Sequence, residues 1–102
     1  MEESKDIPNQ SGDGSENVVY IGRKPLMNYV MAVVTQFNNG MPEVTIKARG
    51  NEISRAVDVK EIVVRKFLPA LKVRGTTTSS EEMTNVDGSR SMVSSIQIIL
   101  AK

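Results

Sequence analysis

Residues 44–49 place the strongest constraint on the fold, because apolar and polar side chains alternate in them without exception. The apolar positions are Val44, Ile46 and Ala48, and the polar positions are Thr45, Lys47 and Arg49. Successive side chains of a strand point to opposite faces of a sheet, so the two sets would face opposite ways. The pattern predicts a strand that is buried on one face and carries a basic row on the other.

Two stretches with helical spacing flank this strand. The first, about residues 25–39, begins at Pro25, which suits the first position of a helix, and stops at Gly40. The second follows Asn51, a competent N-cap, and ends at Pro69. The apolar residues at helical spacing are Leu26, Val30, Val33, Val34 and Phe37 in the first stretch, and Ile53, Ala56, Val57, Val63 and Phe67 in the second.

Three further segments predict strands: residues 18–21, 71–78 and 92–100. The polar residues between the last two carry the turn signal Asp87-Gly88, which we interpret as a two-residue hairpin turn between arms that project beyond the sheet. The element order is then β-α-β-α-β-β. Right-handed crossovers put both helices on one face of the sheet. The predicted fold class is α/β, a two-layer sandwich with a four-stranded mixed sheet.

The first 16 residues differ in composition from the rest. Their only apolar side chains are Met1 and Ile7. They contain one lysine and five acidic residues, which gives a charge of −4. The whole chain has 13 basic and 12 acidic residues, a net charge of +1, so residues 17–102 carry +5. We predict a disordered acidic tail over residues 1–16 and one folded, basic domain over residues 17–102.

The chain has no His and no Cys, which excludes several kinds of chemistry. Zinc sites built on these residues, Cys or His nucleophile systems and thiol redox reactions are all ruled out. We expect no enzymatic activity, no cofactor and no metal. No apolar run approaches the roughly 20 residues of a membrane helix, and the acidic N-terminus is unlike a secretory signal. We therefore expect a cytoplasmic protein with no membrane partner.

Two pairs of basic residues are candidates for binding an anion. Arg23 and Lys24 stand just before the N-terminus of a predicted helix, where a bound phosphate would relieve the repulsion between cation and helix dipole. Lys47 and Arg49 share one strand face. The alternatives are a solvated dibasic turn and an ordinary charged surface. Both pairs lie toward the carboxyl ends of neighbouring strands, so we expect the four to form one patch.

The polar segment 79–91 has two interpretations. It is either an extended β-ribbon that reaches into a groove of nucleic acid or a long mobile loop. Arg90 favours the ribbon, whereas Glu81, Glu82 and Asp87 argue against close contact with phosphates.

The aromatic residues give little sign of a base-stacking platform. We expect Tyr20 and Tyr29 to be partly buried and Phe37 to lie in the core. Phe67, at a helix end beside Leu68-Pro69, either caps the core or is exposed as an association hot spot.

Two long blocks carry a family resemblance. Residues 17–30 (Asn-Val-Val-Tyr-Ile-Gly-Arg-Lys-Pro-Leu-Met-Asn-Tyr-Val) and 46–58 (Ile-Lys-Ala-Arg-Gly-Asn-Glu-Ile-Ser-Arg-Ala-Val-Asp), with residues 67–69 and 93–98, resemble the Alba proteins, small basic chromatin proteins of archaea. The resemblance covers residues 17–102. It implies a fold like the C-terminal domain of translation initiation factor three. It also implies a homodimer that binds double-stranded DNA with little sequence preference, and often RNA.

The resemblance also implies roles for individual residues. Arg23 and Lys24 match the central DNA contact, and Lys47 and Arg49 match the basic residues that lead into the second helix. The hairpin, with Arg90, would extend along the duplex toward the minor groove. Phe67 matches a dimer–dimer contact.

Three departures from the family pattern bear on binding. A lysine pair is replaced by Arg23-Lys24, so an acetylation switch would have to use Lys24. Asn51, which we include in the predicted interface, stands where relatives often have a third basic residue. Glu81 and Glu82 make the hairpin acidic. The changes at Asn51 and in the hairpin would weaken phosphate binding, whereas arginine keeps the charge of lysine.

The leading hypothesis is a nucleoid-associated protein that packages double-stranded DNA on the chromosome. The alternative is an RNA-binding protein, either a chaperone or a ribonucleoprotein component, because A-form RNA offers phosphates too. A protein scaffold without a nucleic-acid role is a third hypothesis. Sulfur transfer on a similar fold would need a nucleophilic cysteine, which the chain lacks.

Overall fold

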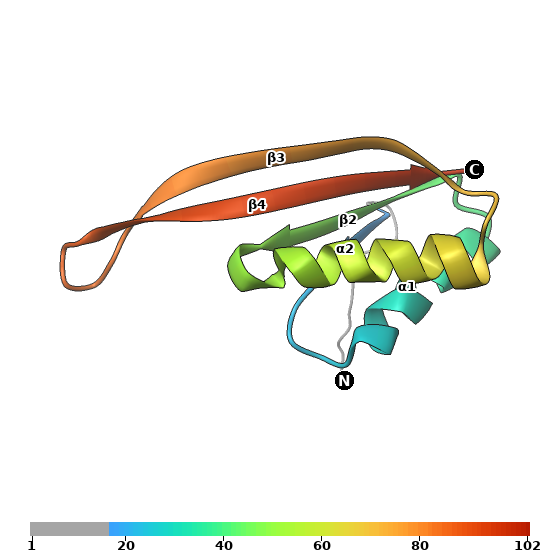
Figure 1. Cartoon of the computed structure of the whole chain (residues 1–102), viewed down its shortest axis with the longest axis horizontal. Coiled ribbons are helices and arrows are strands. Elements are labelled where there is room, and N and C mark those ends of the chain that lie inside the picture. The colour runs from blue at the N-terminus through green and yellow to red at the C-terminus, as the bar shows by residue number, and fades with distance from the viewer. Residues whose placement is uncertain (1–16) are drawn as a thin grey trace.

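The computed structural model describes residues 17–102 as a four-stranded sheet covered on one face by two helices (Figure 1). The predicted tail, residues 1–16, lies outside the described residues. The elements in chain order are β1 (Val18–Tyr20), α1 (Leu26–Asn38), β2 (Glu43–Arg49), α2 (Ile53–Ile62), β3 (Lys72–Thr84) and β4 (Arg90–Ala101). This order and the two layers confirm the predicted fold class.

The sheet is mixed, with the strand order β1-β2-β4-β3. β1 runs parallel to β2, while β4 is antiparallel to both β2 and β3. One row of the register crosses all four strands, from Tyr20 through Lys47 and Gln97 to Thr77. Residues in one row point to the same face, so the register assigns every side chain of the sheet to a face.

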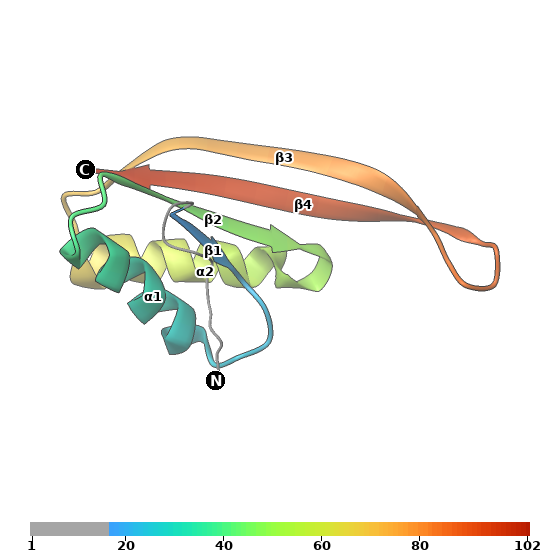
Figure 2. The same ribbon diagram turned by 180° about the vertical axis from the view of Figure 1, so that it is seen from behind.

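The core lies between the sheet and the helices, which Figure 2 shows from behind. The alternation in β2 is confirmed: the three apolar positions are 0–4% exposed. They meet Ile96, Ile98 and Leu100 of β4 and the apolar face of α1, including Phe37. The opposite face carries no helix among the described residues. We call it the open face.

The start of α2 differs from the prediction. Asn51 is not its N-cap, because it lies inside a 3₁₀ turn, Gly50–Glu52, that precedes the helix and is itself capped by Arg49. Gly50 has a φ of +57°, which glycine adopts freely, and the chain therefore turns at once after β2. At the other end, a π-helical turn, Val63–Phe67, continues α2 until Leu68.

The two strands of the hairpin are longer than predicted, and residues predicted to form a polar connection belong to them. β3 continues to Thr84, and residues 85–89 make a five-residue loop instead of a two-residue turn. Asp87 accepts hydrogen bonds from the hydroxyl and the backbone N–H of Ser89, which lower the pKa of its carboxyl, and Gly88 has a φ of +89°. Residues 80–84, 90–94 and the loop form a two-stranded ribbon beyond the body of the sheet (Figure 1). We call this ribbon the arm.

A charged cluster on the surface of α2 predicts how stability depends on pH. Hydrogen bonds from Lys60 and Arg65 lower the pKa of Glu61 from 4.5 to about 2. A carboxyl whose pKa is lowered in the folded state stabilises it above the unfolded pKa and loses that effect as the pH falls through the folded pKa. We expect Glu61→Gln to be less stable than the parent at pH 7, with the difference shrinking below pH 4.5 and vanishing near pH 2. Urea unfolding across this range measures it; a pH-independent difference would contradict it.

Candidate nucleic-acid interface

The loop between β1 and α1 presents two exposed cations, Arg23 and Lys24. Its backbone is held from two sides. On α2, Arg55 donates from Nε to the Gly22 carbonyl at 3.0 Å and from Nη2 to the Lys24 carbonyl. On α1, the Tyr29 hydroxyl accepts the Lys24 N–H at 3.0 Å. The two cations therefore project from a loop that both helices keep in place.

The second pair of cations lies next to this loop. Lys47 and Arg49 are on the open face of β2, and Lys47 is the register partner of Tyr20. Ile21 continues the parallel pairing, since its N–H donates to the Lys47 carbonyl at 2.9 Å. The carboxyl ends of β1 and β2 thus meet at one end of the sheet, as the sequence predicts. We call Arg23, Lys24, Lys47 and Arg49 the basic patch.

Acidic residues of the arm neutralise part of this surface. Arg49 Nη2 lies 2.9 Å from Oε1 of Glu81, and the pair is largely exposed. Nearer the arm's tip, Arg90 Nη1 lies 3.4 Å from Oε1 of Glu82. A phosphate that binds either arginine has to compete with a carboxylate of the same chain.

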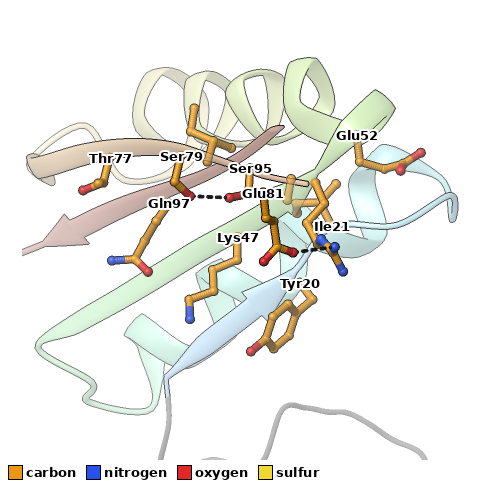
Figure 3. A pocket seen from close by; sticks show the side chains of 12 residues that line it. Tyr20, Ile21, Lys47, Glu52, Thr77, Ser79, Glu81, Ser95 and Gln97 are labelled. Carbon is orange, nitrogen blue, oxygen red and sulfur yellow. Dashed lines mark hydrogen bonds and ion pairs between the residues drawn. The ribbon is translucent and has the colours of Figure 1, made fainter. Parts of the chain in front are cut away.

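A groove of about 470 Å³ opens beside the patch on the open face (Figure 3). It is lined by Tyr20, Ile21, Lys47, Ala48, Arg49, Glu52, Thr77, Ser79, Glu81, Ser95, Ile96 and Gln97. Nζ of Lys47 lies 5.8 Å from the centroid of the Tyr20 ring. The prediction that Tyr20 is partly buried is wrong: it is 65% exposed, because its neighbours Val19 and Ile21 point into the core and its ring projects the other way.

Comparison with known proteins decides the family. The family model described as Alba matches residues 17–81. DNA/RNA-binding protein Alba 1 of Archaeoglobus fulgidus is 56% identical over 88 residues, which are 86% of this chain and 98% of that protein. The chain belongs to the Alba family. The DNA/RNA-binding protein Alba of Methanocella arvoryzae is 51% identical over 87 residues, covering 85% of this chain and 91% of its own length.

Solved Alba structures have the same fold. Alba from Thermoplasma volcanium matches with a TM-score of 0.77 at 48% identity, over 83% of this chain and 99% of that one. ALBA1 from Trypanosoma brucei matches with a TM-score of 0.67 at 30% identity, over 85% and 69%. Both the resemblance and the fold class are confirmed. The relatives are named as binding proteins, which agrees with the prediction that this chain is not an enzyme.

The remaining predicted residues of this Alba chain lie outside the patch. Asn51 is exposed in the 3₁₀ turn after β2. Arg90 lies five positions along β4 from Ser95, the register partner of Arg49, a separation of about 16 Å. Phe67 is exposed (39%) in the π-helical turn at the end of α2 and is not among the side chains packed against the core, so of its two predicted placements the exposed one agrees with the structure. No helix of residues 17–102 is long and apolar enough to cross a membrane.

The structure adds one residue that the sequence did not single out. Arg55 is one of several cations along the second helix, with Lys60 and Arg65, but it is half-buried and bonded to the β1–α1 loop. No local pattern separates it from the other cations of α2. Only the parallel pairing of β1 and β2, which brings that loop beside the start of α2, identifies its role.

Proposed function

We propose that this chain binds double-stranded DNA with little sequence preference and packages it as a homodimer on the chromosome. The observation that carries the proposal is that two cationic segments meet at one end of the sheet: the β1–α1 loop, which Arg55 and Tyr29 hold, and the end of β2. The names of the Archaeoglobus and Methanocella relatives, which are DNA/RNA-binding proteins, support nucleic-acid binding in general.

Binding through the basic patch follows from simple electrostatics. Arg23, Lys24, Lys47 and Arg49 would contact phosphates and release the condensed counterions of the duplex, a term that is insensitive to sequence. α1, a helix of 13 residues, has as its N-cap Pro25, the residue that follows the dibasic pair. Its free N–H groups and partial positive charge favour the same ligand. Lys24 is the residue at which acetylation would remove charge from this surface.

The arm is proposed to follow the duplex toward the minor groove, with Arg90 near its tip. In a two-fold dimer, two arms and two patches would address one length of DNA. The second copy would cover exposed apolar side chains that the register places on the helix side of the hairpin, Val73 (44% exposed) and Met92 (65% exposed). Phe67, at the far end of α2, is proposed for contact between dimers.

The test is a titration of one sequence as duplex DNA and as duplex RNA over a range of salt, with the mass of the protein measured in the same buffer. We expect a dimer whose affinity for DNA falls steeply with salt and differs little between unrelated sequences. Stronger binding to the RNA duplex would favour the RNA-binding alternative. Failure to bind either at about 50 mM salt, where electrostatic binding is strong, would favour a protein scaffold.

The ion pair between Arg49 and Glu81 leads to a prediction of tighter binding. We expect Glu81→Gln to raise duplex affinity several-fold and to steepen the salt dependence by about one phosphate contact per subunit, because Arg49 is released for the nucleic acid. Fluorescence anisotropy at several salt concentrations measures both quantities. Glu43→Gln is the matched control: it also removes one carboxylate from an arginine, but it frees Arg74, at the opposite end of β2 from the patch. Equal gains in the two variants would mean that net charge alone is responsible.

A further inference from the structure

We propose that the groove on the open face binds an unpaired nucleobase of a single-stranded nucleic acid, stacked on the ring of Tyr20. The proposal rests on the proposed function, because it assumes that the basic patch holds a phosphate backbone. It adds a second mode of binding at the edge of that patch, with a different ligand: a base that is out of its duplex.

The first argument is the placement of the Tyr20 ring. The residues on either side, Val19 and Ile21, are each 7% exposed and anchor the strand in the core, whereas Tyr20 is 65% exposed. The ring therefore contributes little to the core. Its backbone is nevertheless held by parallel pairing to β2, so that the ring projects from a fixed base. A fixed, exposed aromatic ring is what base stacking requires.

The second argument is the row of polar groups beside the ring. Lys47, Gln97 and Thr77 follow Tyr20 across the sheet in one register, with neighbouring strands about 4.8 Å apart. Figure 3 shows the Lys47 and Gln97 side chains extending along the same side of the sheet as the ring. The Gln97 amide offers both donors and an acceptor to the edge of a base, and Lys47 offers a cation to a phosphate.

The third argument is the charge and size of the groove. Its volume of about 470 Å³ lies within the range of roughly 300–1,000 Å³ that is usual for small-ligand sites. Arg49 and Glu81 form one wall, and Arg49 connects the groove to the basic patch. A strand whose phosphates follow the patch would therefore pass over the ring.

A base inside a duplex cannot use this site, because both of its faces are covered by neighbouring base pairs. An unpaired base exposes a face, and stacking on an aromatic side chain tolerates any base. The contact between Lys47 and the ring does not compete with stacking. Its distance of 5.8 Å is near the limit of about 6 Å for a cation–π interaction, and one cation covers only one face of the ring.

The experiment compares three ligands, oligo-dT, oligo-U and a DNA duplex, with the full chain and with Tyr20→Leu and Tyr20→Phe. We expect Tyr20→Leu to lose about tenfold in affinity for a single strand, to keep its duplex affinity, and to be rescued by phenylalanine, which retains the stacking surface. Loss with oligo-dT, oligo-U or both supports the site, and the difference between them identifies the preferred strand. Equal affinity of Tyr20→Leu and the parent for both single strands would overturn it.

Tyrosine emission gives an independent readout, since the chain has two tyrosines and no tryptophan. We expect single strands to quench the emission of the parent and to quench Tyr20→Leu, which retains only Tyr29, much less. Absence of quenching in the parent would overturn the proposal even if Tyr20→Leu failed to fold. A smaller or larger assembly mass in solution for Tyr20→Leu than for the parent would also overturn the proposal, because the ring would then act in subunit assembly. If the parent binds neither single strand nor duplex, the proposed function itself fails.

Discussion

Replacing Arg23 and Lys24 together with alanine is expected to weaken duplex binding on the order of 100-fold and to flatten its salt dependence by about two phosphate contacts per subunit. Both side chains project from a loop whose backbone is bonded to α1 and α2, so their removal deletes charge without disturbing those bonds. The loss should be the same for unrelated duplexes, because phosphate contacts carry no sequence information. Anisotropy titrations between about 50 and 200 mM salt measure it.

The chain offers a matched control for this variant. Arg65 and Lys66 are also adjacent cations, in the π-helical turn after α2, about 15 Å along the helix axis from Arg55. Their double replacement removes the same number of charges from another part of the surface. Equal losses in the two double variants would contradict the basic patch and attribute binding to net charge.

Replacing Arg55 with methionine is expected to lower both stability and binding. The guanidinium bonds two carbonyl groups of the β1–α1 loop, and hydrogen bonds of a charged donor contribute about 1.5–3 kcal/mol. Because one of the two bonds is exposed, we expect a loss of about 1–3 kcal/mol in the free energy of unfolding. Duplex affinity should fall about tenfold, since Arg23 and Lys24 would no longer be held in position. Urea unfolding and anisotropy measure the two effects.

Arg55→Lys separates positioning from charge. Lysine keeps the cation, but its single ammonium group cannot reproduce the planar fork that reaches both carbonyls. We therefore expect this variant to retain most of the defect of Arg55→Met. Full recovery of duplex affinity in Arg55→Lys would mean that Arg55 acts as one more cation for phosphate, not as a support for the loop.

The elements and their order could be predicted from the sequence, because they depend on local patterns. Alternation in β2 and helical spacing in α1 and α2 are each set by burial against one core. The meeting of the two cationic segments follows from the handedness of the crossovers. The face of the sheet from which the Tyr20 ring projects could not be predicted, because residues 18–21 are all apolar or aromatic and show no alternation.

The Arg49–Glu81 pair depends on a detail of the hairpin. A two-residue turn at Asp87-Gly88 would pair Glu81 with Ser94. The side chain of Ser94 lies on the face of the sheet that carries the helices, so the side chain of Glu81 would point to that face too. The five-residue loop shifts the register by one residue, pairs Glu81 with Val93, and brings its side chain to the face of Arg49. A shift of one residue reverses the face of every side chain in a strand. The turn geometry, set by Asp87 and Ser89, therefore decides how much of the patch is neutralised.

β3 lies at the edge of the sheet, and this position affects how closely packed copies of the protein would contact one another. Its 13 residues form an edge strand, the kind of surface that templates strand-by-strand aggregation. Four residues of this edge strand are charged: Lys72, Arg74, Glu81 and Glu82. The register of the strand is also irregular between Val73 and Gly75, where a β-bulge would bend it. Copies of the protein packed closely on one polymer would thus meet at edges whose charges and curvature oppose amyloid-like stacking. Glu81, which pairs with Arg49, and its neighbour Glu82 thus also place like charges where two such edges would meet.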